Sequence, residues 1–312
     1  MEHRLNPTEQ TVHDVFSRDL PPVLTIDSGD TVIFKTLEAA GYAFDNPTPF
    51  QMPPKFREGY FTENHTMSGP VAIRGAMPGM TLEVRLNQIV PGKWGRTNSG
   101  GYPSDINDRL GISDIERYRL WWEIDHDTNT ALSSGGHRVP LRPFMGNLGM
   151  PPNEPGQHST HPPRYCGGNL DCKELVAGSR LYLPVSVEGA LFSIGDGHGI
   201  QGDGETAGPA LECPMEIVNV SFHLHPEMHL TMPRAWTPAG WVTFGFNADL
   251  NIAWMDAVEG MVGLMHELYD FGKAEALNLL SLVVDLRITQ VVNGVRGVHA
   301  ILPHDMIEKV GM

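Results

Sequence analysis

The sequence predicts a β-dominated protein with a pair of helices late in the chain. Its 34 glycines and 25 prolines are spread over 312 residues, which is typical of many short strands joined by tight turns. Several runs alternate apolar and polar residues, as half-buried strands do. One stretch near the C-terminus instead repeats its apolar residues at helical spacing. We expect a single unit over residues 1–312, with an N-terminal β portion (1–160) and a second β portion (161–312) that carries the helices.

The alternating runs predict the strands in chain order. Residues 23–27 and 31–35 are joined by a Ser-Gly-Asp turn and predict a hairpin. Residues 69–75 and 80–86 follow the same pattern around a Pro-Gly turn and predict a second hairpin. Further strands are expected at residues 181–187, 217–224 and 241–246.

Two segments between these strands predict irregular structure. Residues 92–107 are polar and rich in glycine, so we expect a long loop over the surface or across a subunit contact. Residues 140–163 are rich in proline and predict extended, irregular chain.

Helical periodicity begins only after residue 250. Apolar residues step by four, three, four and three along one face: Trp254, Val258, Met261, Met265 and Leu268. We interpret this methionine-rich stripe as core packing, in a helix that ends near Gly272. A second helix over residues 273–283 and a strand over 286–292 are expected to follow.

Composition excludes several classes of function. The net charge of −15 argues against binding to nucleic acid or to anionic membrane surfaces. Three cysteines without a C-x-x-C motif do not make a disulfide framework, which favours the reducing cytoplasm. We find no signal peptide at the N-terminus and no run of the ~18 to 20 apolar residues that a membrane helix needs. The sequence therefore predicts a cytoplasmic enzyme of ordinary domain size.

The segment from Ser193 to Glu205 is the strongest candidate for a functional site. Five polar residues fall within ten positions, separated mostly by glycine: Asp196, His198, Gln201, Asp203 and Glu205. We expect a glycine-rich loop here, on which these side chains converge in a way that a regular strand or helix would not allow. Carboxylates beside an imidazole are ligands of divalent metals, so the segment predicts a metal or catalytic site. The alternative is a solvated acidic turn.

Other polar patterns leave more room for alternatives. If the chain is extended after Gly168, then Asn169, Asp171 and Lys173 share one face. Such a face could take part in metal ligation or proton transfer, or it could be only the polar edge of a strand. His65 stands alone before a predicted strand. His223, His225 and His229 resemble a zinc-binding spacing, but an exposed strand explains them better. Cys166 has no histidine partner in sequence that would make it a nucleophile.

Several segments, taken in order, resemble the acetamidase/formamidase family over nearly the whole chain. They are residues 16–32 (FSRDLPPVLTIDSGDTV), 65–70 (HTMSGP), 162–175 (PPRYCGGNLDCKEL), 178–205 (GSRLYLPVSVEGALFSIGDGHGIQGDGE) and 285–300 (DLRITQVVNGVRGVHA). The resemblance implies a mostly β fold of β-sandwich or jelly-roll character with an α+β C-terminal portion. It also implies hydrolysis of the C–N bond of a small amide such as formamide or acetamide, a divalent metal, and a homodimer or homotetramer.

Carried over by position, the resemblance names the metal-site candidates His65, Asp171, Asp196, His198 and Glu205. Carboxylate oxygens with one or two imidazoles suit zinc, and a second site could take calcium. Glu205 is our candidate for the general base, with Asp171 as the runner-up. We expect Lys173 or Asn169 to hold the substrate carbonyl, and Gln201 to contact the substrate as well. The role of Cys166 and of the three clustered histidines is left open.

Two other functions compete with hydrolysis of a linear amide. The same site could open a lactam, because the size of the pocket would decide and the sequence does not show it. In the other alternative, the chain is a calcium-stabilised, carbohydrate-binding β-sandwich that catalyses nothing.

Overall fold

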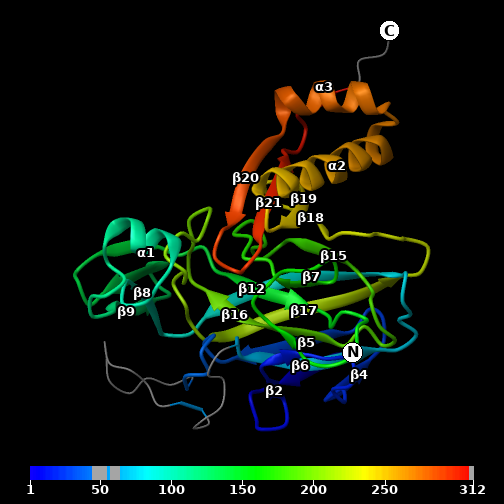
Figure 1. The fold of residues 1–312 in the computed structure, drawn as a ribbon. Coiled ribbons are helices and arrows are strands. Elements are labelled where there is room, and N and C mark those ends of the chain that lie inside the picture. The colour runs from blue at the N-terminus through cyan, green and yellow to red at the C-terminus, as the bar shows by residue number, and fades with distance from the viewer. Residues whose placement is uncertain (44–54, 57–63, 309–312) are drawn as a thin grey trace.

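The computed structural model describes residues 1–43, 55–56 and 64–308, and this part of the chain is mostly β, as the sequence predicts (Figure 1). Its largest sheet has nine strands. In order across the sheet these are β1 (Glu2–Leu5), β5 (Thr31–Thr36), β17 (Met215–His225), β7 (Thr81–Pro91), β15 (Arg180–Pro184), β18 (Arg234–Thr237), β19 (Gly240–Asn247), β21 (Arg296–Leu302) and β20 (Asp285–Gln290).

A second sheet carries most of the site described below. Its strands are β14 (Gly167–Asn169), β12 (Phe144–Gly149), β16 (Phe192–His198), β6 (Met67–Ile73) and β2 (Val12–His13), with β4 (Leu24–Ile26) also paired to β6. We call it the site sheet. Its central strands are antiparallel, and β12 and β16 align Met145 with Gly197 and Asn147 with Gly195.

Smaller elements complete the described chain. A four-stranded sheet runs β11 (Arg138–Pro140), β10 (Thr130–Ser133), β9 (Tyr118–Asp125) and β8 (Trp94–Ser99), and β13 (His158–Ser159) pairs with β3 (Val15–Phe16). The helices are α1 (Asp105–Leu110), α2 (Leu250–Tyr269) and α3 (Lys273–Val283). In Figure 1, α1 lies beside β8 and β9, while α2 and α3 lie together at the far end of the nine-stranded sheet. No helix among the described residues has the length and apolar character needed to cross a membrane.

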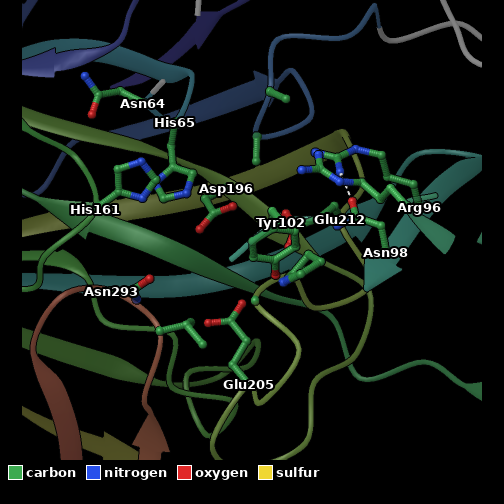
Figure 2. Close-up of a pocket in the computed structure, with 16 residues that line it drawn as sticks. Asn64, His65, Arg96, Asn98, Tyr102, His161, Asp196, Glu205, Glu212 and Asn293 are labelled. Carbon is green, nitrogen blue, oxygen red and sulfur yellow. Dashed lines mark hydrogen bonds between the residues drawn. The ribbon is translucent and has the colours of Figure 1, made fainter. Parts of the chain in front are cut away.

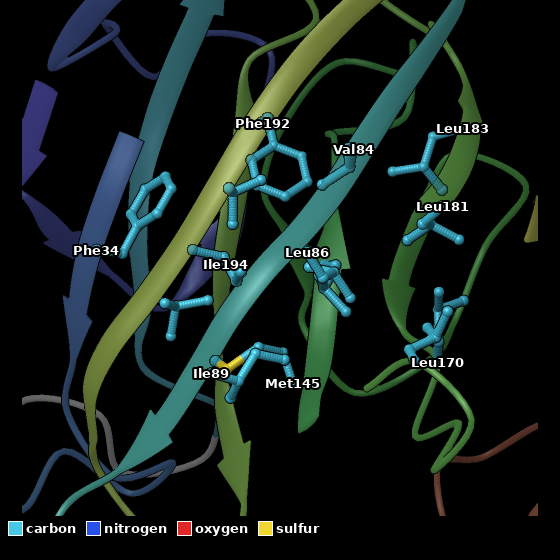
Figure 3. Packing of buried hydrophobic residues seen from close by; sticks show 14 of the residues in the cluster. Phe34, Val84, Leu86, Ile89, Met145, Leu170, Leu181, Leu183, Phe192 and Ile194 are labelled. Carbon is cyan, nitrogen blue, oxygen red and sulfur yellow. The ribbon is translucent and has the colours of Figure 1, made fainter. Parts of the chain in front are cut away.

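One hydrophobic core joins the nine-stranded sheet to the site sheet. Val84 and Leu86 of β7 contribute to the same buried cluster as Phe192 and Ile194 of β16 (Figure 3). Burying each such side chain contributes roughly 1.5–3 kcal/mol. The packing of two sheets through one apolar layer is the expected sandwich arrangement.

Both predicted hairpins are wrong in their pairing. The strands form where the alternation places them, but β4 and β5 lie in different sheets, as do β6 and β7. β4 pairs in parallel with β6, and β5 pairs with β1 and β17. A turn signal shows that the chain reverses, but it does not show whether the chain returns to the same sheet or crosses to the opposite one.

The two segments predicted to be irregular each contain a strand. Residues 92–107 do not form the predicted long loop throughout, because β8 pairs with β9 along its full length. The polar residues Arg96 and Asn98 of β8 line a cavity. Within 140–163, β12 is buried at every position, and the nearest prolines, Pro143 and Pro151, lie outside the strand and do not interrupt its hydrogen bonds. The polar composition of β8 and the prolines around β12 are therefore the reason why the sequence did not predict these two strands.

Both helices form where the sequence predicts them, but the buried face of the first differs from the predicted one. α3 spans the predicted residues, and α2 ends at Tyr269 with Asp270 in a left-handed cap. Met261 and Met265 are fully buried, as expected, but Trp254 and Leu268 are each 40% exposed, so the predicted stripe is only half correct. The buried face is instead centred on small residues, Ala253 and Ala257, because α2 packs closely against β19 and β21.

Candidate functional site: a buried cluster of acids around His198

The segment predicted to be a glycine-rich loop begins as a strand, which corrects the expectation from sequence. Phe192–His198 forms β16, and all of its residues are buried. Its glycines serve close packing: a Cβ atom at Gly195 would lie 2.3 Å from the carbonyl oxygen of Thr66. Asp196 itself has a left-handed φ of 57°, so the regular alternation of a strand does not place it, yet its side chain lies beside that of His198. Asp196 Oδ1 lies 3.4 Å from His198 Nε2.

Asp171 reaches the same point from a different segment. Its φ of 47° is in the left-handed region, so the chain is not extended there and does not present Asn169, Asp171 and Lys173 on one face. The Asp171 N–H donates to the carbonyl of Gly146 on β12, and Asn293 Nδ2 donates to Asp171 Oδ2 at 2.5 Å. Ligand atoms of Asp171, Asp196 and His198 all lie within 4.8 Å of one another.

A second group of acids shares His198. Ligand atoms of His198, Glu205 and Glu212 also lie within 4.8 Å of one another, and all three residues are buried. Glu212 Oε1 is 3.4 Å from His198 Nε2. The cluster therefore has four carboxylates around one imidazole, which is the donor set of a divalent cation site.

A glycine keeps space open between the carboxylates. A Cβ atom at Gly146 would lie 2.5 Å from Asp171 Oδ1 and 2.6 Å from Asp196 Oδ2. Any side chain at this position would fill the space between these two oxygens. The absence of one leaves room for an ion there.

Gln201 fixes the orientation of His198. The Gln201 amide donates from Nε2 to the carbonyl of Asp171 at 2.8 Å, so its Oε1 faces His198 Nδ1 at 3.0 Å and accepts from it. In its neutral form, with the proton held on Nδ1, His198 would present the Nε2 lone pair to a metal ion. Such a partner behind a histidine is the usual support of a metal ligand. Gln201 thus acts behind the cluster and does not line the cavity.

Several polar atoms of the cluster are buried and have no hydrogen-bond partner within the described part of the chain. They are Asp171 Oδ1, His198 Nε2, Glu205 Oε2 and Glu212 Oε2. A buried polar atom without a partner is costly, and so many at one point require an explanation. Oxygen and imidazole nitrogen donors that converge in this way fit a metal ion, so the residues present are suited to hold one.

Burial and mutual charge perturb the protonation of the cluster. Burial raises the pKa of Asp171, and the Asp196 carboxylate raises it further. Burial also raises the pKa of Glu205 well above its usual value, with the Asp171 charge adding to it. Burial opposes ionisation of Asp196, but the charges of His65 and His198 outweigh it and lower the pKa of Asp196. The cluster by itself retains protons that a bound cation would displace.

A cavity of about 400 Å³ opens onto the cluster. Asp196, Glu205 and Glu212 line it (Figure 2). His65 lines the same cavity, and its ring packs edge-on against His161 with 4.5 Å between centroids. Four of the five metal-site candidates from sequence lie in the cluster, Asp171, Asp196, His198 and Glu205, whereas His65 lines the cavity and is not among the grouped ligand atoms.

Two other candidates lie elsewhere. Lys173 Nζ forms an ion pair with Asp203 Oδ2 at 2.9 Å and is not among the residues that line the cavity. Asn169 is buried in β14 beside Asn147 and does not line the cavity either. The left-handed φ of Asp171 interrupts the extended chain on which Asn169, Asp171 and Lys173 were predicted to share a face.

The sequence did not reveal three further residues of the site. Glu212 supplies a carboxylate, Asn293 binds Asp171, and Arg96 lines the cavity while pairing with buried Glu38 at 2.5 Å. Glu212 had one signal: it is a lone acid in the otherwise apolar run Ala210-Leu-Glu-Cys. Asn293 and Arg96 had none, because long connections bring them to the site.

The remaining sequence motifs have local roles. His225 Nε2 lies 2.6 Å from Glu83 Oε2, and His229 Nδ1 donates to the carbonyl of Gly79. Burial raises the pKa of the Cys166 thiol to about 11, so this residue is no nucleophile at neutral pH.

Comparison with known proteins assigns the chain to a family. The model of the acetamidase/formamidase family matches residues 1–159 and 155–309. The chain belongs to this family.

Individual relatives agree with the assignment. A formamidase of Methylophilus methylotrophus is 26% identical over 253 residues, covering 64% of this chain and 61% of the relative. An acetamidase of Mycolicibacterium smegmatis is 24% identical over 271 residues, covering 66% and 64%. The crystal structure of an acetamidase from Bacillus halodurans superposes with a TM-score of 0.85 at 27% identity, covering 99% of this chain and 100% of that one. The chain spans less than two thirds of the length of the two enzymes compared by sequence.

Proposed function

We propose that this chain is a metal-dependent amidohydrolase that cleaves the C–N bond of a small linear amide, of the formamide or acetamide type, to a carboxylate and ammonia. The observation that carries the proposal is the set of potential metal-ligand atoms around His198. Within the described residues these carboxylate oxygens and the imidazole nitrogen are buried and have no hydrogen-bond partner. Membership in the acetamidase/formamidase family favours this function over a non-catalytic carbohydrate-binding sandwich.

The metal would be held by Asp171, Asp196 and His198, with His65 beside them. We propose zinc, because carboxylate oxygens combined with imidazole nitrogen suit this ion. A bound divalent ion would polarise the amide carbonyl and lower the pKa of water from ~16 towards ~7.

Glu205 is suited to move the proton in this reaction. It lines the cavity and is buried, and its Oε2 has no hydrogen-bond partner within the described residues, so this oxygen is available to accept and return a proton. As water oxygen bonds to the carbonyl carbon, the Glu205 carboxylate accepts a proton from that water. The proton then passes to the amide nitrogen as the C–N bond breaks, so that ammonia leaves.

The rest of the cavity would orient the amide. His65 and His161 lie on one wall, within the same space as Glu205 (Figure 2). An imidazole N–H facing the carbonyl oxygen would donate a hydrogen bond that strengthens as charge develops on that oxygen. This assignment replaces Lys173, whose ammonium is paired with Asp203.

Metal content and ammonia release, measured on the same preparation, test the proposal. We expect about one zinc per chain or more, release of ammonia from formamide or acetamide, loss of activity with chelator, and recovery with Zn²⁺. Glu205→Gln should lower kcat by about 10²- to 10⁴-fold while the metal remains bound. The matched control is Glu216→Gln, which alters an exposed glutamate on β17. A folded, metal-loaded Glu205→Gln protein with full turnover would contradict the assigned base.

The choice between linear and cyclic amides needs its own comparison. Formamide, acetamide and a five-membered lactam should be tested with the wild-type chain under identical conditions. We expect kcat/KM to be highest for a linear amide. A higher value for the lactam would make ring opening the function of the same site.

A further inference from the structure

A second cavity adjoins the one that holds the acid cluster. It has a volume of about 480 Å³, and its lining combines the apolar residues Ile106, Val291 and Val292 with polar ones, among them Asp105 and Arg296. Tyr102, Gly208 and Val292 line both cavities, so these residues form the boundary between them. Tyr102 has by far the largest side chain of the three.

The Tyr102 side chain is held firmly at this boundary. Its hydroxyl donates to the carbonyl of Ala207 at 2.8 Å, and the Arg117 guanidinium lies 5.0 Å from the centre of its ring. Gly208 allows the approach: its φ is +106°, and a Cβ atom there would lie 2.8 Å from the Tyr102 hydroxyl oxygen. The ring is therefore anchored at both its hydroxyl and its face.

The two cavities differ in what they would accept. Asp196, Glu205 and Glu212 make the first one polar, so an alkyl chain of several carbons would desolvate carboxylates there without compensation. The apolar part of the second cavity's lining, formed by Ile106, Val291 and Val292, would accept such a chain. A long acyl chain attached to the reacting carbonyl would have to pass the Tyr102 ring to reach it.

From this geometry we propose that Tyr102 determines substrate specificity by limiting the acyl chain of the amide to a few atoms. The neighbouring cavity is then a latent acyl subsite that the ring closes off. This inference rests on the proposed amide hydrolysis and specifies its substrate class.

Substitution of Tyr102 tests the proposal with a series of straight-chain primary amides from formamide to hexanamide. Tyr102→Ala should raise kcat/KM for hexanamide relative to acetamide by about tenfold or more, because each methylene placed in an apolar pocket can contribute tenfold or more. Tyr102→Phe keeps the ring and should leave the ratio near the wild-type value. An unchanged ratio in a folded, active Tyr102→Ala protein, or an equal rise in Tyr102→Phe, would overturn the proposal.

A double variant identifies where the longer chain goes. Ile106 lines the second cavity and not the first. Ile106→Trp, added to Tyr102→Ala, should fill that cavity and return the ratio towards the wild-type value. If hexanamide is still favoured, the chain does not occupy this cavity and the proposed subsite is wrong.

Product binding separates this inference from the proposed function. The shift in Tm with acetate and with hexanoate can be measured without turnover. Hexanoate should stabilise Tyr102→Ala more than the wild-type chain, whereas acetate should stabilise both alike. A wild-type chain that hydrolyses no amide would overturn the proposed function, while equal hexanoate shifts in both proteins would overturn the size limit.

Discussion

The site sheet and the helical pair bury opposite kinds of residue. In β16 the charged side chains Asp196 and His198 are fully buried in the middle of the molecule. In α2 the exposed face carries Trp254 and Met255, which are 40% and 47% exposed. Burial follows hydrophobicity on the inner face of α2, where only packing is at stake. In the site sheet, burial does not follow hydrophobicity. Charged side chains are buried there at a cost in desolvation free energy, which a bound ion would offset.

The largest expected effect comes from removing a buried charge of the site sheet. Asp196→Asn should reduce amide turnover by about 10³-fold or more and reduce the metal bound per chain, because a charged ligand is replaced by a neutral amide. Turnover and metal content of the folded protein provide the check. The exposed carboxylate Glu216, changed to Gln, serves as the control. Normal metal content and turnover in Asp196→Asn would place the metal elsewhere.

The helical pair should respond only in stability. Met261→Ala, at a fully buried position of α2, should lower the free energy of unfolding by about 2–5 kcal/mol. Met255→Ala on the exposed face of the same helix should change it by no more than about 0.5 kcal/mol. Urea unfolding measures both. Equal losses would mean that the exposed face is covered in solution.

Stability of the site sheet should fall in acid because of His13 on β2. Its Nδ1 donates to the carbonyl of Val15, so Nε2 accepts from Ser193 on β16. Burial lowers the pKa of His13 from 6.5 to about 4, although the Val15 hydrogen bond opposes it. Between these values the unfolded chain binds the proton and the folded chain does not, so this contribution is present above pH 6.5 and is lost towards pH 4.

The size of this effect follows from the same pKa difference. At 1.36 kcal/mol per pKa unit, it amounts to about 3 kcal/mol. The free energy of unfolding at pH 7 and pH 4 should be compared between the wild-type chain and His13→Gln. A His13→Gln protein that loses as much stability as the wild type would assign the acid sensitivity to other groups.

The smallest expected effect tests the packing of β16 itself. Gly195→Ala should destabilise the chain by about 1–3 kcal/mol, because the new methyl would meet the Thr66 carbonyl oxygen. Gly202→Ala is the matched control from the same glycine-rich segment, since a Cβ atom there meets nothing within 4 Å. Similar stabilities of the two variants would show that β16 can shift to make room.

Much of the fold could be predicted from sequence because local patterns carry it. Alternation located β5, β15, β17 and β19, and periodicity located α2 and α3. Strand pairing could not be predicted in this way, since β4 and β5 are neighbours in the chain but lie in different sheets. The sequence did not predict β8, because its polar residues line a cavity and break the usual apolar alternation. It did not predict β12, because prolines lie on both sides of this buried strand.

The residue types of the chain are enough to predict that a site is present and of what kind. Asp171, Asp196, His198 and Glu205 are of metal-binding types, and the density of such residues among glycines indicates a site from the sequence alone.

The division of work among these residues depends on tertiary contacts. Pairing of β12 with β14 and β16 brings Asp171 beside Asp196, while a separate segment contributes Glu212. The same packing places Gln201 behind His198, and it sets the Tyr102 ring between two cavities. The physical reason is that residue type sets what a side chain can do, whereas contacts between distant segments set which atoms it meets.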